Sequence, residues 1–172
     1  MDFLPLAKDR YSVRKLKDQP VEQEKIEKIL EAAMVAPTAA NYQPFRVWVM
    51  KNPEALEKVR SAVPMPFVQE SPVVFVVGGD PETAWTRSFD GHNFADVDAS
   101  IAATHMMLEV HELGLGTTWV GYFDVDKMVS IFPEMKGYSL VAVFGVGYPA
   151  EDSEPNKLHS TFKDKDQLFT IL

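Results

Sequence analysis

The feature of this sequence that most constrains its fold is a long helical pattern over residues 95–113, whose apolar side chains cover more than one side. A helix that is apolar on two sides must be buried on two sides. With 172 residues the chain fits one domain, so we expect the second covering to come from another subunit. The two sets of apolar residues are Val97, Ile101 and Leu108, and Ala102, Met106, Val110 and Leu113.

Shorter helices and strands are predicted on both sides of this segment. Residues 21–36 have one apolar helical face, and Pro37 ends the pattern. Residues 73–77 are apolar throughout, which predicts a central strand covered on both faces. Further helices are predicted over residues 54–62 and 124–131, and further strands over 45–50 and 140–146.

The connecting segments have different characters. Residues 38–44 have small and turn-forming side chains typical of a loop, and residues 79–93 form a polar linker. Residues 114–116 cap the long helix, and residues 117–122 follow as a short extended piece. The tail over residues 150–172 is polar until its apolar end, which either frays or docks on a neighbour.

The composition excludes several kinds of chemistry. The chain has no cysteine, so disulfides, thiolate catalysis and Cys-ligated iron–sulfur or zinc sites are excluded. Any redox chemistry must therefore come from a bound organic cofactor. His105 and His111 lie six residues apart in the long helix, on different faces, whereas metal-ligand pairs favour a spacing of four. We therefore predict no metal site.

Charge and hydropathy limit the partners. The net charge of −8 repels polyanions and argues against a nucleic-acid partner. No segment has the roughly 18 consecutive apolar residues of a membrane span, and the N-terminus lacks the pattern of a secretory signal. We therefore expect no membrane partner and a cytoplasmic location.

Two arginines and a hydroxyl lie close together near the N-terminus. In an extended segment, Arg10, Ser12 and Arg14 point to one side. Guanidinium groups and a hydroxyl suit a phosphate, whose oxygens accept charge-assisted hydrogen bonds. Taken alone, the stretch from Lys8 to Lys17 also fits a solvated basic surface.

Three blocks of the sequence resemble the nitroreductase family of FMN enzymes. Residues 10–14, Arg-Tyr-Ser-Val-Arg, resemble the family's Arg-x-Ser-x-Arg signature. Residues 36–45, Ala-Pro-Thr-Ala-Ala-Asn-Tyr-Gln-Pro-Phe, are similar to its second block, Ala-Pro-Ser-x-x-Asn-x-Gln-Pro-Trp. Residues 113–121, Leu-Gly-Leu-Gly-Thr-Thr-Trp-Val-Gly, resemble its Gly-Leu-Gly segment. The three blocks occur in the family's order and extend over much of the chain.

The resemblance implies a fold and an assembly. The fold would be α+β in three α/β/α layers, with a central mixed, mainly antiparallel sheet flanked by helices. Residues 1–172 would form a single FMN-binding domain, and the long central helix would lie at the interface of a homodimer with FMN sites between the subunits.

The resemblance also implies which residues bind FMN. Arg10, Ser12 and Arg14 would hold the phosphate and the polar edge of the isoalloxazine, and Tyr11 belongs to the same run. A second set, from the dimer partner, would line the flavin: Pro37, Thr38, Ala39 and Asn41. The backbone of a third set, Trp119, Val120 and Gly121, would run along the ring near N5, with Gly121 allowing close approach. The alternative for Trp119 is a core aromatic.

The sequence departs from the family at two contacts. The basic residue that completes the phosphate site near the C-terminus is commonly an arginine, and here Lys163 is the first choice and Lys157 the second. A lysine supplies charge without a bidentate fork, so this contact should be weaker. Where the family often has an asparagine at the pyrimidine edge, Gln69 is the candidate; otherwise Gln69 is an exposed helix residue.

The expected function is reduction of nitroaromatics, quinones or flavins by NAD(P)H through FMN, without an essential catalytic side chain. The segment Gly145, Val146, Gly147 lacks a full dinucleotide fingerprint, so NAD(P)H is expected to dock over the flavin. The alternatives are a specialised dehalogenating or flavin-fragmenting member, a flavin-binding protein without turnover, and a scaffold without cofactor. Residues 81–94 are short for a lid, which favours an open, permissive pocket.

Overall fold

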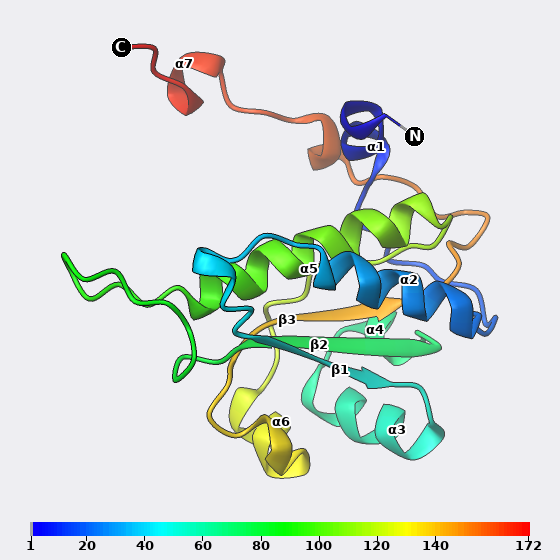
Figure 1. The fold of residues 1–172 in the computed structure, drawn as a ribbon. Coiled ribbons are helices and arrows are strands. Elements are labelled where there is room, and N and C mark those ends of the chain that lie inside the picture. The colour runs from blue at the N-terminus through cyan, green and yellow to red at the C-terminus, as the bar shows by residue number, and fades with distance from the viewer. Residues whose placement is uncertain (1) are drawn as a thin grey trace.

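A three-stranded sheet lies between two layers of helices in the computed structural model, which describes residues 2–172 (Figure 1). Strand β2 (Val73–Gly79) is central and pairs antiparallel with β1 (Phe45–Met50) and with β3 (Ser139–Val146). All seven residues of β2 are buried, as an apolar strand covered on both faces requires. The prediction of a central strand is therefore confirmed, and the strand extends two residues beyond the predicted end.

The two faces of the sheet have separate cores. Helices α2 (Gln23–Met34) and α5 (Ala95–Glu112) cover one face. Helices α3 (Pro53–Ala62), α4 (Pro66–Gln69) and α6 (Val125–Ile131) cover the other face. Ile29, Phe75, Met106 and Phe144 are fully buried in the first core, and Val59, Val74, Val76 and Met128 in the second. This arrangement is the predicted three-layer α+β fold.

Local signals set the ends of several helices. The Asn52 side chain accepts a hydrogen bond from Ala55 N–H at 2.8 Å, and Pro53 occupies the first turn of α3. Gly114 has a φ of 72°, the left-handed conformation that ends α5. Helix α2 ends at Met34, two residues before the predicted end, because a residue that precedes proline is disfavoured in helical conformation.

An extended N-terminal segment crosses the end of the sheet beside residues 116–118. Ser12 forms a parallel bridge with Thr117, so the pairing is mixed although the three named strands are all antiparallel. Val13 N–H donates to the Thr117 carbonyl at 3.0 Å, and Thr118 Oγ1 donates to the Val13 carbonyl at 2.7 Å. At Gly116 a Cβ would lie only 2.6 Å from a methyl group of Val13, so only glycine allows this approach.

Helix α5 is buried on one side only within the single chain. Ala102, Met106 and Val110 are buried against the sheet and α2, whereas Val97 is 38% exposed, and Ile101 is half-buried. The apolar face that was expected to need a second covering is therefore open within this chain. No helix of residues 2–172 has the length and apolar character needed to cross a membrane.

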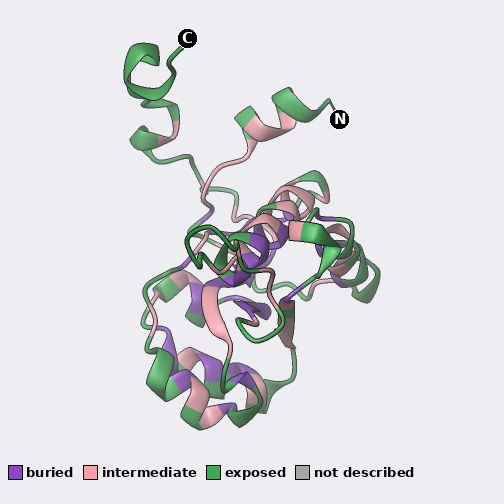
Figure 2. Cartoon of the chain, turned by 60° about the vertical axis from the view of Figure 1, so that its left-hand side comes forward, coloured by how far each residue is buried: buried purple, intermediate pink, exposed green. Residues whose placement is uncertain are grey.

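Both ends of the chain stand away from the layered body (Figures 1 and 2). Helix α1 (Phe3–Asp9) has no buried residue, and residues 161–172, which include α7 (Lys165–Leu168), are exposed throughout. Apolar side chains nevertheless occur in these ends: Phe3, Leu4, Phe162, Leu168, Phe169, Ile171 and Leu172. A chain that exposes so many large apolar groups has surface that a partner can cover.

Candidate functional site at the N-terminal strand

Arg10, Ser12 and Arg14 line one pocket of about 320 Å³, together with three residues of the C-terminal segment. The prediction that these three side chains share one side of an extended strand is therefore confirmed. Val13, which points the other way, is 2% exposed. The C-terminal residues of the pocket are Asn156, Leu158 and His159.

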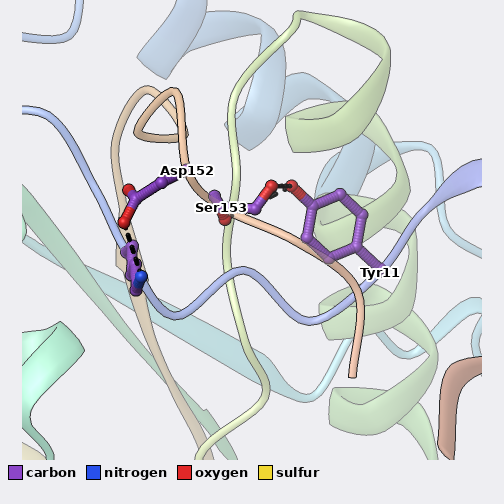
Figure 3. Close-up of polar contacts among 4 residues, drawn as sticks. Tyr11, Asp152 and Ser153 are labelled. Carbon is purple, nitrogen blue, oxygen red and sulfur yellow. Dashed lines mark hydrogen bonds and ion pairs between the residues drawn. The ribbon is translucent and has the colours of Figure 1, made fainter. Parts of the chain in front are cut away.

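The C-terminal segment is held against the N-terminal strand by hydrogen bonds (Figure 3). Tyr11 Oη lies 3.1 Å from the Ser153 carbonyl, to which it donates, and Lys15 Nζ donates to Asp152 at 2.6 Å. Ala150 N–H donates to the Lys15 carbonyl at 3.0 Å. The hydrogen bond from Lys15 lowers the pKa of the Asp152 carboxyl and raises the pKa of Lys15. Residues about 140 apart in sequence thereby form one pocket.

The donor set of this pocket suits a phosphate. Two guanidinium groups, a hydroxyl, an amide and an imidazole line it, and no carboxylate is among its lining residues. Such groups donate hydrogen bonds to phosphate oxygens, and the two arginines add positive charge in a chain whose net charge is −8. The Arg14 guanidinium already donates to the Ser12 carbonyl at 3.3 Å, which keeps it beside the pocket.

The loop from Thr38 to Gln43 has an unusual backbone. Ala40, Asn41 and Gln43 have φ of 50°, 58° and 53°, a left-handed conformation that non-glycine residues seldom adopt. Gln43 N–H donates to Thr38 Oγ1 at 3.0 Å, which closes the loop on itself. Strained backbone of this kind persists only where surrounding contacts hold it.

A buried carboxylate holds this loop to the start of α5. Asp98 Oδ1 accepts a hydrogen bond from Ala39 N–H at 2.9 Å, and Asp98 is 1% exposed. Its Oδ2 has no hydrogen-bond partner among the described residues. The sequence interpretation missed Asp98, although an acidic residue between Val97 and Ala99 in an apolar helix was the available signal.

Trp119, Val120 and Gly121 lie beside β3. Val120 pairs with Val143 through two backbone hydrogen bonds, and the Trp119 ring meets Phe144 edge-on at 5.5 Å. Trp119 is thus half-buried against the core, which agrees with the alternative interpretation of Trp119 as a core aromatic. Gly121 is exposed, and a Cβ there would have no atom within 4 Å among those of the described chain, which leaves space for a ligand against its backbone.

Gln69 and the two tail lysines, Lys157 and Lys163, were predicted site residues but do not line the pocket. Gln69 donates its side-chain amide to the carbonyls of Arg60 and Val63, at 2.9 and 2.8 Å. Lys157 begins the turn Lys157–Ser160 but does not line the pocket, and Lys163 lies in the exposed tail. His159 and Asn156, which the sequence interpretation did not select, line it instead.

The arginine strand and the strained loop lie at opposite ends of α5. The loop contacts Asp98 near the helix start, whereas Asp9, which precedes Arg10, pairs with His111 at 3.0 Å near the helix end. Asp98 and His111 are thirteen positions apart in the helix, roughly 20 Å at a rise of about 1.5 Å per residue. One chain therefore does not bring Pro37, Thr38, Ala39 and Asn41 to the pocket of Arg10.

Comparison with known proteins decides the family. The model of the nitroreductase family matches residues 7–64 and 61–148. The chain belongs to the nitroreductase family. A relative in Methanothermobacter thermautotrophicus that carries the name NADH dehydrogenase/NAD(P)H nitroreductase is 33% identical over 170 residues, which cover 92% of this chain and 86% of the relative. The family predicted from the three sequence blocks is confirmed, and the chain is classed with oxidoreductases.

Solved nitroreductase structures share the fold closely. A nitroreductase family protein from Clostridium difficile 630 is 36% identical, covers 99% of this chain and 98% of its own, and superposes with a TM-score of 0.90. An FMN-dependent nitroreductase from Clostridium difficile R20291 is 26% identical, with coverage of 95% and 99% and a TM-score of 0.76. A nitroreductase from Desulfovibrio desulfuricans solved in complex with FMN is 24% identical, with coverage of 98% and 95% and a TM-score of 0.79.

Proposed function

We propose that this member of the nitroreductase family binds FMN and uses NAD(P)H to reduce small oxidants such as nitroaromatics, quinones or flavins. The observation that carries the proposal is the pocket in which Arg10, Ser12 and Arg14 share one side of a strand. Its donors suit the FMN phosphate, and two structural relatives are described as FMN-dependent or solved with FMN. The family and the pocket chemistry therefore support the same cofactor.

The proposal includes a homodimer with the flavin sites at the subunit interface. The two groups of residues assigned to FMN lie at opposite ends of α5 and do not line one pocket within a single chain, which supports a site completed by a second subunit. A two-fold partner brings the loop of one subunit to the arginine strand of the other. The open apolar face with Val97 and Ile101, and the exposed apolar tail, supply surface for such a contact.

The chain's own residues would bind and orient the FMN and the substrates. The flavin would supply the redox chemistry, by accepting hydride at N5 and passing it on to the oxidant. Arg10 and Arg14 would fix the phosphate end. The backbone of Trp119, Val120 and Gly121 would run beside the flavin ring, and Gly121 leaves room for the ring to approach closely. The nicotinamide and the oxidant would occupy the same open face in turn, so the scheme needs no essential side-chain acid.

Purification followed by anaerobic reduction tests the proposal. The protein is expected to copurify with or rebind FMN, and NADH or NADPH is expected to bleach the flavin within a catalytic timescale. Addition of a quinone or a nitroaromatic should then restore the oxidised spectrum. A yellow protein that neither nicotinamide reduces would be a flavin-binding protein without turnover, and a protein that fails to bind FMN would contradict the proposal entirely.

A further inference from the structure

We propose that His159, with Asn156 beside it, completes the phosphate subsite of the pocket and takes the place that the sequence suggested for a lysine. This inference rests on the proposed function, because it concerns how FMN is held. It assigns a binding role to a residue outside the three family blocks. It also predicts that the subsite separates FMN from riboflavin, which has no phosphate.

The structure places His159 directly at the pocket. Its ring is half-buried and lies edge-on to the Tyr11 ring, with centroids 6.3 Å apart and planes at 70°. Tyr11 is in turn tied through its hydroxyl to Ser153. Tyr11 thus connects the strand that carries Arg10 and Ser12 to the segment that carries His159.

The geometry of the C-terminal turn selects His159 over its lysine neighbour. The turn Lys157–Ser160 is a 3₁₀ helix, and Asn156 caps it by accepting a hydrogen bond from Leu158 N–H at 3.0 Å. His159 N–H donates to the Asn156 carbonyl at 2.8 Å, which holds the two residues together at this turn. Asn156 and His159 both line the pocket, whereas Lys157, which follows Asn156, does not.

The surrounding charges favour an anion at this point. Two acidic side chains of the segment lie beside cations, since Asp152 pairs with Lys15 at 2.6 Å and Glu151 lies 3.6 Å from Lys17. A third, Glu154, is exposed, and none of the three lines the pocket. An imidazole donates one N–H when neutral and two when protonated, and the Asn156 amide donates two more. His159 and Asn156 can therefore meet phosphate oxygens opposite the two arginines.

Flavin titrations of four proteins test this assignment. The dissociation constants of FMN and of riboflavin are measured by flavin fluorescence for the wild type, His159→Ala, His159→Arg and the matched control Lys157→Ala. His159→Ala is expected to bind FMN about tenfold more weakly, as the loss of a charge-assisted hydrogen bond predicts. Its riboflavin affinity and the unfolding temperature of its cofactor-free form should stay at the wild-type values.

The other two variants sharpen the result. Lys157→Ala should leave FMN affinity within about twofold of the wild type, and His159→Arg should bind FMN at least as well as the wild type, because a guanidinium offers a fork to phosphate. Unchanged FMN affinity in His159→Ala would overturn the inference while the proposed function stands. Equal losses for FMN and riboflavin would also overturn it, since the role would then be structural. A wild type that binds neither flavin would refute the proposed function itself.

Discussion

The Asp98 carboxylate accepts a hydrogen bond from the Ala39 backbone N–H at 2.9 Å, and Asp98 is almost completely shielded from solvent. This contact joins the start of α5 to a loop with three left-handed residues, Ala40, Asn41 and Gln43. A buried carboxylate costs free energy unless its oxygens are hydrogen-bonded, and Oδ2 has no partner among the described residues. The hydrogen bond to Ala39 N–H fixes the loop at the point where it meets α5.

Replacing Asp98 should loosen this loop. Asp98→Ala removes the acceptor for Ala39 N–H and is expected to lower the free energy of unfolding by about 1 to 2 kcal/mol. We also expect FMN affinity to fall by about tenfold, because the loop loses its fixed conformation. Asp98→Asn retains an acceptor oxygen and should lose less. Denaturant unfolding and flavin titration measure both effects, with the exposed neighbour Asp96→Ala as control. Equal effects of Asp98→Ala and Asp96→Ala would contradict this role.

Arg14→Ala should weaken FMN binding by roughly 1.5 to 3 kcal/mol, the value of a charged hydrogen bond. Arg14 is exposed and lines the pocket, so its loss should not disturb the core. Isothermal titration with FMN measures the change, and Lys8→Ala, an exposed lysine on α1, is the matched loss of one positive charge. The assignment fails if the two variants bind FMN alike.

Gly116→Ala should detach the N-terminal strand. The new Cβ would lie 2.6 Å from a Val13 methyl group, and such overpacking costs about 1 to 3 kcal/mol. Gly121→Ala has open space and should leave stability unchanged. Because the flavin ring is proposed to approach Gly121, Gly121→Ala should lose FMN affinity although its stability is unchanged. Thermal unfolding of the cofactor-free proteins separates the two cases, and a stable Gly116→Ala protein would show that Val13 can move aside.

Ile101→Asp should separate the subunits of the proposed dimer. Ile101 is half-buried on the open face of α5, and a charge there cannot be covered by an apolar partner surface without a large desolvation cost. Light scattering should show a monomer, and FMN should be lost with the partner's loop. Ser61→Asp at an exposed position of α3, on the other face of the sheet, shows whether any added charge suffices. A monomeric wild type would remove the basis for this prediction.

Stability should depend on Glu109 at neutral pH. Burial raises the pKa of the Glu109 carboxyl, and Glu112 raises it further. The folded state then binds the proton more tightly than the unfolded state, so stability falls as pH rises from the ordinary value of 4.5 through the raised pKa. Glu109→Gln should raise the unfolding temperature at neutral pH by about 1 to 2 °C. Below the ordinary pKa the gain should vanish, and exposed Glu57→Gln should show no gain at either pH.

The parts of the fold that were predicted correctly depend on local patterns. The strand over residues 45–50 has the predicted limits, and the wholly apolar run beginning at Val73 is the central strand. Helix α1 was not predicted, because it buries no residue and so carries no amphipathic pattern. The polar linker over residues 79–93 contains an ordered hairpin, in which Thr86 bridges Asn93 and the Trp85 ring packs on Phe94.

The candidate site was predicted in part for a different reason. Arg10, Ser12 and Arg14 share a side because strand alternation is local. The place of His159 depends on contacts such as Tyr11 with Ser153, 142 residues apart, which no spacing rule gives. The Gln69 amide is engaged by two carbonyls at the end of α3, a use that composition cannot reveal.

The placement of the two flavin-contacting groups at opposite ends of α5 has a genetic consequence. In the proposed dimer each site takes its arginine strand from one chain and its loop from the other. Coexpressing Arg14→Ala chains with Asp98→Ala chains would then form mixed dimers in which one site carries both lesions and the other carries neither. Two alleles that are each defective alone would then complement one another, because one of the two sites in each mixed dimer would be intact.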